Sequence, residues 1–371
     1  MANAFRAKIE SYLMLARRFS LTHPHAGEVE MPMLVPAFSS KGFRLLDFEK
    51  RKKTHRYSEM AQAFINLSPS ISTSVLVSAY DIHFKYFVPP GSDIEDMIAA
   101  LSYPRLVFVD SGGYELIDEF DSTENRTHNY TPEFAFGYEE YLGVLNKCFN
   151  GRKNIHLVIS NFDYSSKGKR LTEQISEARS LFQDYDGVLT DFIIKPTTEK
   201  ATLVDFGTFS KNDFGNLRDF DVIGVTEKEL GKTLIEKAKC ISLLRLKLNE
   251  AGVNAPIHVW GGLDPIVTPL LFFAGAEIFD GVSWLRYSYK NGLAICREAY
   301  SVVEPKVNVR TKLDVVRMPS CQDIILYLDA LASQLQQWVD YEGRDFSMFD
   351  PSVKDHLKRA YKTLRSTVKE I

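Results

Sequence analysis

The sequence predicts an α/β fold, a (β/α)8 barrel with insertions and a helical extension at its carboxyl end. Short apolar runs rich in β-branched residues recur eight times, and helix-like segments separate the later ones. Strands that alternate with helices pair in parallel, and eight of them favour a closed barrel over an open sheet. The strands are expected at 33–38, 74–79, 106–109, 155–160, 188–194, 220–225, 256–260 and 277–282.

One long helix is expected between the sixth and seventh strands, over residues 226–252. Thr226 is the expected cap and Gly252 the expected stop, because threonine suits the first position of a helix and glycine the position after its end.

The pattern changes after residue 300, which divides the chain into a barrel domain at 1–300 and a helical extension at 301–371. A helix is expected at 320–341, opened by Pro319 and Ser320. Residues 351–371 form a second helical pattern, with a basic face opposite an apolar stripe of Val353, Leu357, Tyr361, Leu364 and Val368. We expect both helices to pack on the barrel, with a nucleic-acid or subunit contact as the alternative.

Composition excludes a protein coated in basic charge, since the 371 residues carry a formal net charge of -3. A local basic groove is still compatible with that balance. The run "EKRKKTHRY" at 49–57 is either a solvated loop or a grip on phosphates through Arg51, Lys52 and Lys53. An amino-terminal segment without a signal-peptide core, and the lack of a membrane-length apolar run, predict a cytoplasmic protein.

Cysteine usage argues against a cysteine-based zinc site, so no metal or other cofactor is expected. The four cysteines have no CxxC spacing, and such sparse thiols suit a reducing compartment: Cys148, Cys240, Cys296 and Cys321.

Polar residues follow several predicted strands at the ends where barrels carry their functional residues. Asp110 precedes Ser-Gly-Gly-Tyr, Asp163 follows the fourth strand, Trp260 precedes two glycines, and Asp280 lies in the eighth strand. Taken singly, Asp110 fits a turn, Trp260 a core position and Asp280 a helix cap. Their conjunction on one predicted face is the stronger signal.

Two facing carboxylates suit chemistry at a glycosidic carbon. One attacks the sugar, and the other gives a proton to the leaving group. If a purine leaves, aspartates can bind its N–H edges while Tyr114 and Trp260 stack on its faces. The nucleotide would then have to turn out of its stack.

These segments resemble the tRNA-guanine transglycosylase family, in order, over roughly residues 30–295. "DSGGYE" at 110–115 is similar to the family signature. "HVWGGLDPIVTPLLFFAGAEIFDGV" at 258–282 and "RYSYKNGLA" at 286–294 resemble its later motifs. "SNFDYSS" at 160–166 and "DVIGVTEKELG" at 221–231 are weaker matches.

The resemblance implies a (β/α)8 barrel that exchanges guanine in a polynucleotide for a 7-deazaguanine base. It makes Asp280 the nucleophile and Asp110 the general acid/base. The base would be held by Asp163 at its Watson–Crick edge and by the backbone at Gly224 and Val225, with Tyr114 and Trp260 stacking and Ser111, Gly261 and Lys195 nearby. The polynucleotide would meet Arg286, Lys290, Arg51, Lys52 and Lys53.

The chain departs from the family in the parts that bind tRNA. The zinc motif is missing, because Cys296 and Cys321 are isolated and no histidine follows them before His356. Glu115 and Lys195 each stand where the family has Gln. A second arginine of the later motif is replaced by Tyr289 or Lys290.

The sequence therefore favours a zinc-less paralogue similar to the DNA-modifying branch called DpdA, with DNA as the polynucleotide. Exchange on tRNA is the first alternative. A non-catalytic barrel that binds nucleic acid or supports a partner subunit is the second, and a small-glycoside hydrolase the third. A homodimer or a partner protein stays open, as does the identity of the inserted base.

Overall fold

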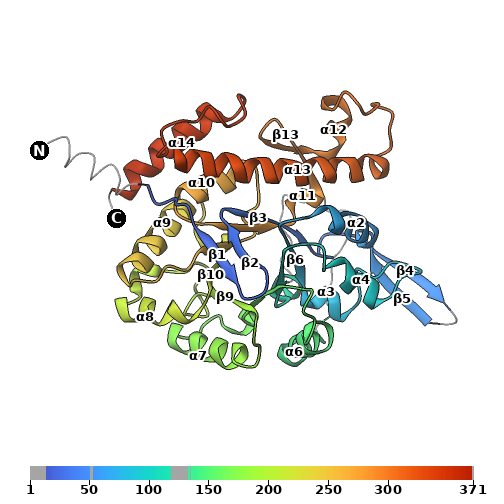
Figure 1. Ribbon diagram of the computed structural model, residues 1–371, viewed down its shortest axis with the longest axis horizontal. Helices are drawn as coiled ribbons and strands as arrows, with labels where there is room; N and C mark the ends of the chain where they lie inside the picture. The colour runs from blue at the N-terminus through green and yellow to red at the C-terminus, as the bar shows by residue number, and fades with distance from the viewer. Residues whose placement is uncertain (1–13, 51–52, 118–132, 134, 370–371) are drawn as a thin grey trace, which may run out of the picture.

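Eight parallel strands close into a barrel in the computed structural model, which confirms the predicted fold class (Figure 1). The structure describes residues 14–50, 53–117, 133 and 135–369. Around the barrel the strands run β10-β11-β12-β3-β6-β7-β8-β9. Each predicted strand is found, with ends within two residues of those expected: β3 (Met33–Phe38), β6 (Ser74–Ser78), β7 (Leu106–Asp110), β8 (Leu157–Ser160), β9 (Leu189–Ile194), β10 (Val222–Thr226), β11 (Ile257–Trp260) and β12 (Ile278–Gly281).

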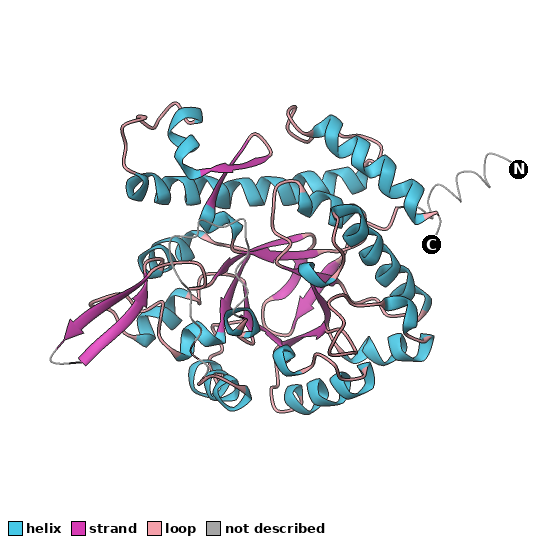
Figure 2. Ribbon diagram, turned by 180° about the vertical axis from the view of Figure 1, so that it is seen from behind, coloured by secondary structure: helices cyan, strands magenta, loops and turns pink. Residues whose placement is uncertain are grey.

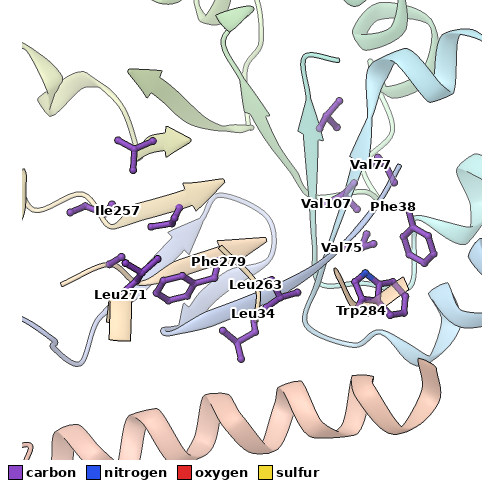
Figure 3. Packing of buried hydrophobic residues seen from close by; sticks show 14 of the residues in the cluster. Leu34, Phe38, Val75, Val77, Val107, Ile257, Leu263, Leu271, Phe279 and Trp284 are labelled. Atoms are coloured by element: carbon purple, nitrogen blue, oxygen red, sulfur yellow. The ribbon is translucent and has the colours of Figure 1, made fainter. Parts of the chain in front are cut away.

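Side chains along each strand alternate between the barrel interior and the layer under the helices. Phe108 and Ile278 belong to the interior cluster. Their neighbours Val107 and Phe279 belong to the outer cluster, part of which is drawn in Figure 3. The parity places residues 110 and 280, each two positions further along, on the interior side.

Helices surround the barrel on its outer face (Figure 2). Very short helices follow β6, β7 and β12 directly: α3 (Ala79–His83), α5 (Gly113–Leu116) and α11 (Ser283–Arg286). The other barrel helices are α2 (Ala61–Leu67), α4 (Ile94–Ala100), α6 (Tyr138–Val144), α7 (Leu171–Phe182), α8 (Lys211–Gly215), α9 (Leu234–Glu250) and α10 (Val267–Phe273). Within the described ranges, no helix combines the length and the apolar character required to cross a membrane.

The helix expected from Thr226 begins eight residues later, at Leu234, so the predicted cap is wrong. Thr226 is the last residue of β10, and Thr233 caps α9 by accepting a hydrogen bond from the N–H of Glu236. The N–H of Thr233 in turn donates to the carboxylate of Glu236, which completes a capping box. Gly252 does follow the helix, with φ +70°. Residues 227–233 thus stay outside the helix.

Three antiparallel hairpins were not predicted. In the first, β1 (Ser20–His23) and β2 (Gly27–Glu30), Leu21 and Val29 join the interior cluster just before β3 and close the amino end of the barrel. The second replaces the loop expected at 49–57 with β4 (Leu45–Lys50) and β5 (Lys53–Ser58), which project from the barrel (Figure 1). The third, β13 (Tyr287–Lys290) with β14 (Leu293–Cys296), follows α11.

The carboxyl-terminal helices differ from the prediction at their start. α12 (Arg297–Val303) runs across the expected domain boundary, and α13 (Leu313–Asp340) begins before Pro319. A proline there removes one hydrogen bond and would normally end a helix. Val316, Ser320 and Cys321 are all buried around it, so packing holds this turn in place.

An aromatic cluster joins the carboxyl-terminal helices to the barrel helix α10. Trp338 of α13 is 0% exposed, and its ring lies 4.1 Å from that of Phe273 in α10. Tyr361 of α14 (Lys354–Val368) meets the same tryptophan edge-on at 5.0 Å. Leu357 and Leu364, on the same stripe, are also buried.

We expect Trp338→Ala to lower the free energy of unfolding by about 3–5 kcal/mol, the usual cost of emptying a buried aromatic site. Because the cluster ties extension to barrel, the loss should shift one cooperative transition in chemical denaturation. Leu326→Ala on the exposed side of the same helix is the control and should change little. A separate, early transition of the extension with the barrel unaffected would contradict this account.

Candidate active site

The two acids predicted to be catalytic both lie at the carboxyl end of the barrel. Asp110 ends β7 and is 8% exposed, while Asp280 lies in β12 and is 6% exposed. The negative charge of Asp280 is one of the causes that raise the pKa of Asp110, so the two carboxylates lie within electrostatic reach. Both side chains face the interior, as the strand parity requires.

Burial, followed by the charges of Glu115, Asp163 and Asp280, raises the pKa of Asp110 well above its usual value. The N–H of Gly112 opposes the shift by a hydrogen bond. Gly112 has φ +90°, and a Cβ there would lie 2.9 Å from both Tyr80 and Phe136, so only glycine fits. The environment therefore favours a protonated Asp110, as a general acid requires.

Glu115, which stands where the family has Gln, is a buried acid beneath this site. It is 1% exposed and accepts hydrogen bonds from the hydroxyls of Ser39 (2.5 Å) and Ser78 (2.8 Å). Burial raises the pKa of Glu115 despite these two bonds. Its charge is the largest carboxylate contribution to the raised pKa of Asp110.

Among the described residues, two groups lie against the same carboxylate oxygen of Asp280. The N–H of Gly261 donates to Oδ1 of Asp280 over 2.9 Å, and Nε2 of His258 lies 3.2 Å from the same oxygen. Gly261, expected to bind the base, thus holds the expected nucleophile.

Sequence reasoning missed His258 and its partner Asp191. Nδ1 of His258 lies 2.6 Å from Oδ2 of Asp191, and both residues are 0% exposed. Desolvation lowers the pKa of His258, but Asp191 and Asp280 outweigh it and raise this pKa to about 9. The sequence signal that could have found them is the alternation of side chains along a strand. In β9 and β11, Asp191 and His258 each lie two positions from a residue of the interior cluster, so both point into the barrel.

Trp260 faces the barrel interior and is 8% exposed. Its ring lies 4.5 Å from the imidazole of His258 at an interplanar angle of 32°. A Cβ on Gly224 would lie 2.7 Å from Nε1 of Trp260 and 2.6 Å from Oδ1 of Asp191, so glycine makes room for both. Val225, next in β10, is fully buried in the outer cluster.

Asp163 and Lys195 form an ion pair beside the acids. Nζ of Lys195 lies 3.1 Å from Oδ2 of Asp163 and 3.0 Å from Oε2 of Glu229. Desolvation lowers the pKa of Lys195, but the charges of Asp163 and Glu229 dominate and raise it. Ser111 donates to Oδ1 of Asp163 over 2.6 Å. Glu229 reaches this position because residues 227–233 stay outside α9.

Tyr114 is partly buried and carries a cation on its ring, since Nζ of Lys41 lies 4.4 Å from the ring centre. The side chain of Arg286 donates to the carbonyl of Lys41 over 2.9 Å and lies 3.4 Å from the hydroxyl of Tyr114. The structure thus brings Arg286 and Tyr114 together.

The other expected nucleic-acid contacts are Lys290, Arg51, Lys52 and Lys53. Lys290 in β13 pairs with Glu304 at 2.6 Å. Arg51 and Lys52 lie outside the described residues, and Lys53 begins β5, of whose side chain nothing is described. In the described part of the chain, no group of three or more His, Cys, Asp or Glu side chains is arranged to hold a metal ion.

Comparison with known proteins does not assign the chain to a family. No protein-family model matches the sequence, and no curated protein matches it. The resemblance to transglycosylases therefore depends on the motifs themselves and on the geometry above.

The raised pKa of Asp110 predicts that Asp110→Asn stabilises the fold at high pH. An acid whose pKa is raised by folding binds its proton more tightly in the folded state, so the wild type loses stability as pH rises above the unfolded value. Asparagine does not titrate. Urea denaturation across pH should therefore show an advantage for Asp110→Asn at pH 8 that shrinks towards pH 4. A difference that does not vary with pH would contradict the raised pKa.

Proposed function

We propose that this protein is a base-exchange transglycosylase that replaces guanine in a polynucleotide with a 7-deazaguanine base. The observation that supports it most is the pair Asp110 and Asp280, which face the interior at the carboxyl end of one barrel within electrostatic reach. The two carboxylates have different surroundings, and such a difference allows one to act as a proton donor and the other as a nucleophile.

In the first half-reaction, a carboxylate oxygen of Asp280 attacks the anomeric carbon of the target nucleotide. A bond forms between that oxygen and the sugar, the bond from the sugar to guanine breaks, and the proton of Asp110 goes to the leaving base. The phosphodiester chain is not cut.

In the second half-reaction, Asp110 is a carboxylate and takes the N–H proton of the incoming 7-deazaguanine. The base nitrogen attacks the anomeric carbon, and the ester to Asp280 breaks. Both acids return to their starting protonation states, so the exchange needs no oxidant or metal ion in its balance.

The pair Asp163 and Lys195 suits the polar edge of guanine. A carboxylate accepts from the two neighbouring N–H groups of that edge, and an ammonium donates to the carbonyl beside them. Ser111 fixes Oδ1 of Asp163, and Glu229 fixes the ammonium from its other side. An adenine edge offers the opposite order of groups and would leave the buried pair unsatisfied.

DNA is the polynucleotide that we propose, with tRNA as the alternative, because the departures from the family fall on its tRNA-binding parts. Incubation with radiolabelled guanine and either duplex DNA or tRNA decides between them. We expect label in DNA. Label only in tRNA would replace the first proposal by the second, and label in neither would favour a non-catalytic barrel.

Replacing Asp280 with Asn should abolish exchange, because the nucleophile is lost, while the thermal transition stays cooperative. Asp205→Asn, which changes an exposed helix cap instead, is the matched control and should keep wild-type exchange. Unchanged exchange in Asp280→Asn would remove the covalent mechanism.

A further inference from the structure

The two carboxylate oxygens of Asp280 differ in their surroundings. Oδ1 has both contacts described above, to the N–H of Gly261 and to Nε2 of His258. Within the part of the chain that the structure describes, Oδ2 has no hydrogen bond or ion pair. One oxygen is thus anchored, and the other is left to react.

His258 acts on Asp280 from a position that no substrate can reach, since its side chain is 0% exposed. Phe108 of β7 meets the imidazole edge-on at 5.3 Å, and Trp260 covers it at 4.5 Å. The charged groups that face the ring are Asp191 from β9 and Asp280 from β12. The adjoining strand β10 presents Gly224, which has no side chain.

We propose that Asp191 and His258 form a positioning pair that places a positive charge beside Oδ1 of Asp280 and presents its Oδ2 to the anomeric carbon. This inference depends on the function proposed above. Neither residue touches the substrate, so both act through Asp280.

The physical reason is competition for a proton among neighbouring acids. The charge of Asp280 is one of the causes that raise the pKa of Asp110, and neighbouring buried carboxylates oppose each other's ionisation. An imidazolium 3.2 Å from Asp280 stabilises the anion there and leaves the proton to Asp110. Asp191 in turn stabilises the imidazolium through Nδ1. The pair therefore decides which acid donates and which attacks.

The first test needs no substrate. Nitrogen NMR of protein labelled in its histidines should show one imidazole that keeps both protons at pH 7.5, well above the ordinary histidine range. The signal should vanish in His258→Gln, which assigns it. In Asp191→Asn the same ring should lose a proton at lower pH. A neutral His258 ring in the wild type at pH 7.5 would overturn the inference.

The second test uses the pH dependence of exchange. Asp191→Asn should reduce kcat by about 10²-fold, the cost of a misplaced reacting group, and leave KM for the base unchanged. Because Asp191 is one of the causes that raise the pKa of His258, the imidazole should lose its charge at lower pH in this variant, and the alkaline limb of the kcat profile should move to lower pH.

Glu277→Gln is the control for the second test, because Glu277 forms another fully buried ion pair, with Arg245, just before β12. It should reduce stability without moving the alkaline limb. Asp191→Asn could also reduce stability and leave the pH profile of kcat unchanged. In that case Asp191 and His258 would have a structural role only.

The two tests separate this inference from the proposed function. Absence of exchange in the wild type would reject the function, while the NMR signal would still report whether His258 is charged. Exchange together with a neutral His258 would reject the positioning pair alone.

Discussion

Repulsion among buried carboxylates is the constraint on which the rest of the site depends. Acids with most of their side chains withdrawn from water gather at the carboxyl end of the barrel, among them Asp81, Asp110, Glu115, Asp163, Asp191, Glu229 and Asp280. The buried cations described among them are Lys41, Lys195 and His258. Because isolated buried charges are costly, protons must remain on some of the acids. Lys195 neutralises the acids around Asp163, and His258 those around Asp280, which leaves Asp110 as an acid that is easily protonated.

The two ends of the barrel differ in the residues that they bury. At the amino end, the hairpin β1–β2 places Leu21 and Val29 in the interior cluster, and the buried pair of Arg245 and Glu277 ties α9 to the start of β12. At the carboxyl end, β6, β7, β8 and β10 end at polar residues, and very short helices follow β6, β7 and β12. Stability is thus concentrated away from the acids, whose mutual repulsion opposes folding.

The sequence predicts the strands and the two acids because barrel strands have a strong local signature. An apolar run that stops at Asp110 or at Trp260 is visible without coordinates. Parity then places the acids inside.

Contacts between distant segments were not predictable in the same way. Asp191 and His258 are 67 positions apart, and each by itself is one polar residue in an apolar strand. By sequence alone, Thr226 and Thr233 are equally good helix caps. The ion pair between Glu229 and Lys195 forms only in the folded chain, and it keeps the residues between the two threonines out of α9. The helix α13 passes through Pro319 because the barrel beneath it supplies packing that local preference does not include.

The protonation of the two central acids is the most direct test of this account. Infrared difference spectra of the protein with carbon-13 in its aspartates, recorded against Asp110→Asn and Asp280→Asn at pH 7, identify which carboxyl keeps a proton. The account predicts a protonated carboxyl band that disappears in Asp110→Asn and persists in Asp280→Asn. A band that disappears in Asp280→Asn instead would assign the proton to the proposed nucleophile and contradict the account.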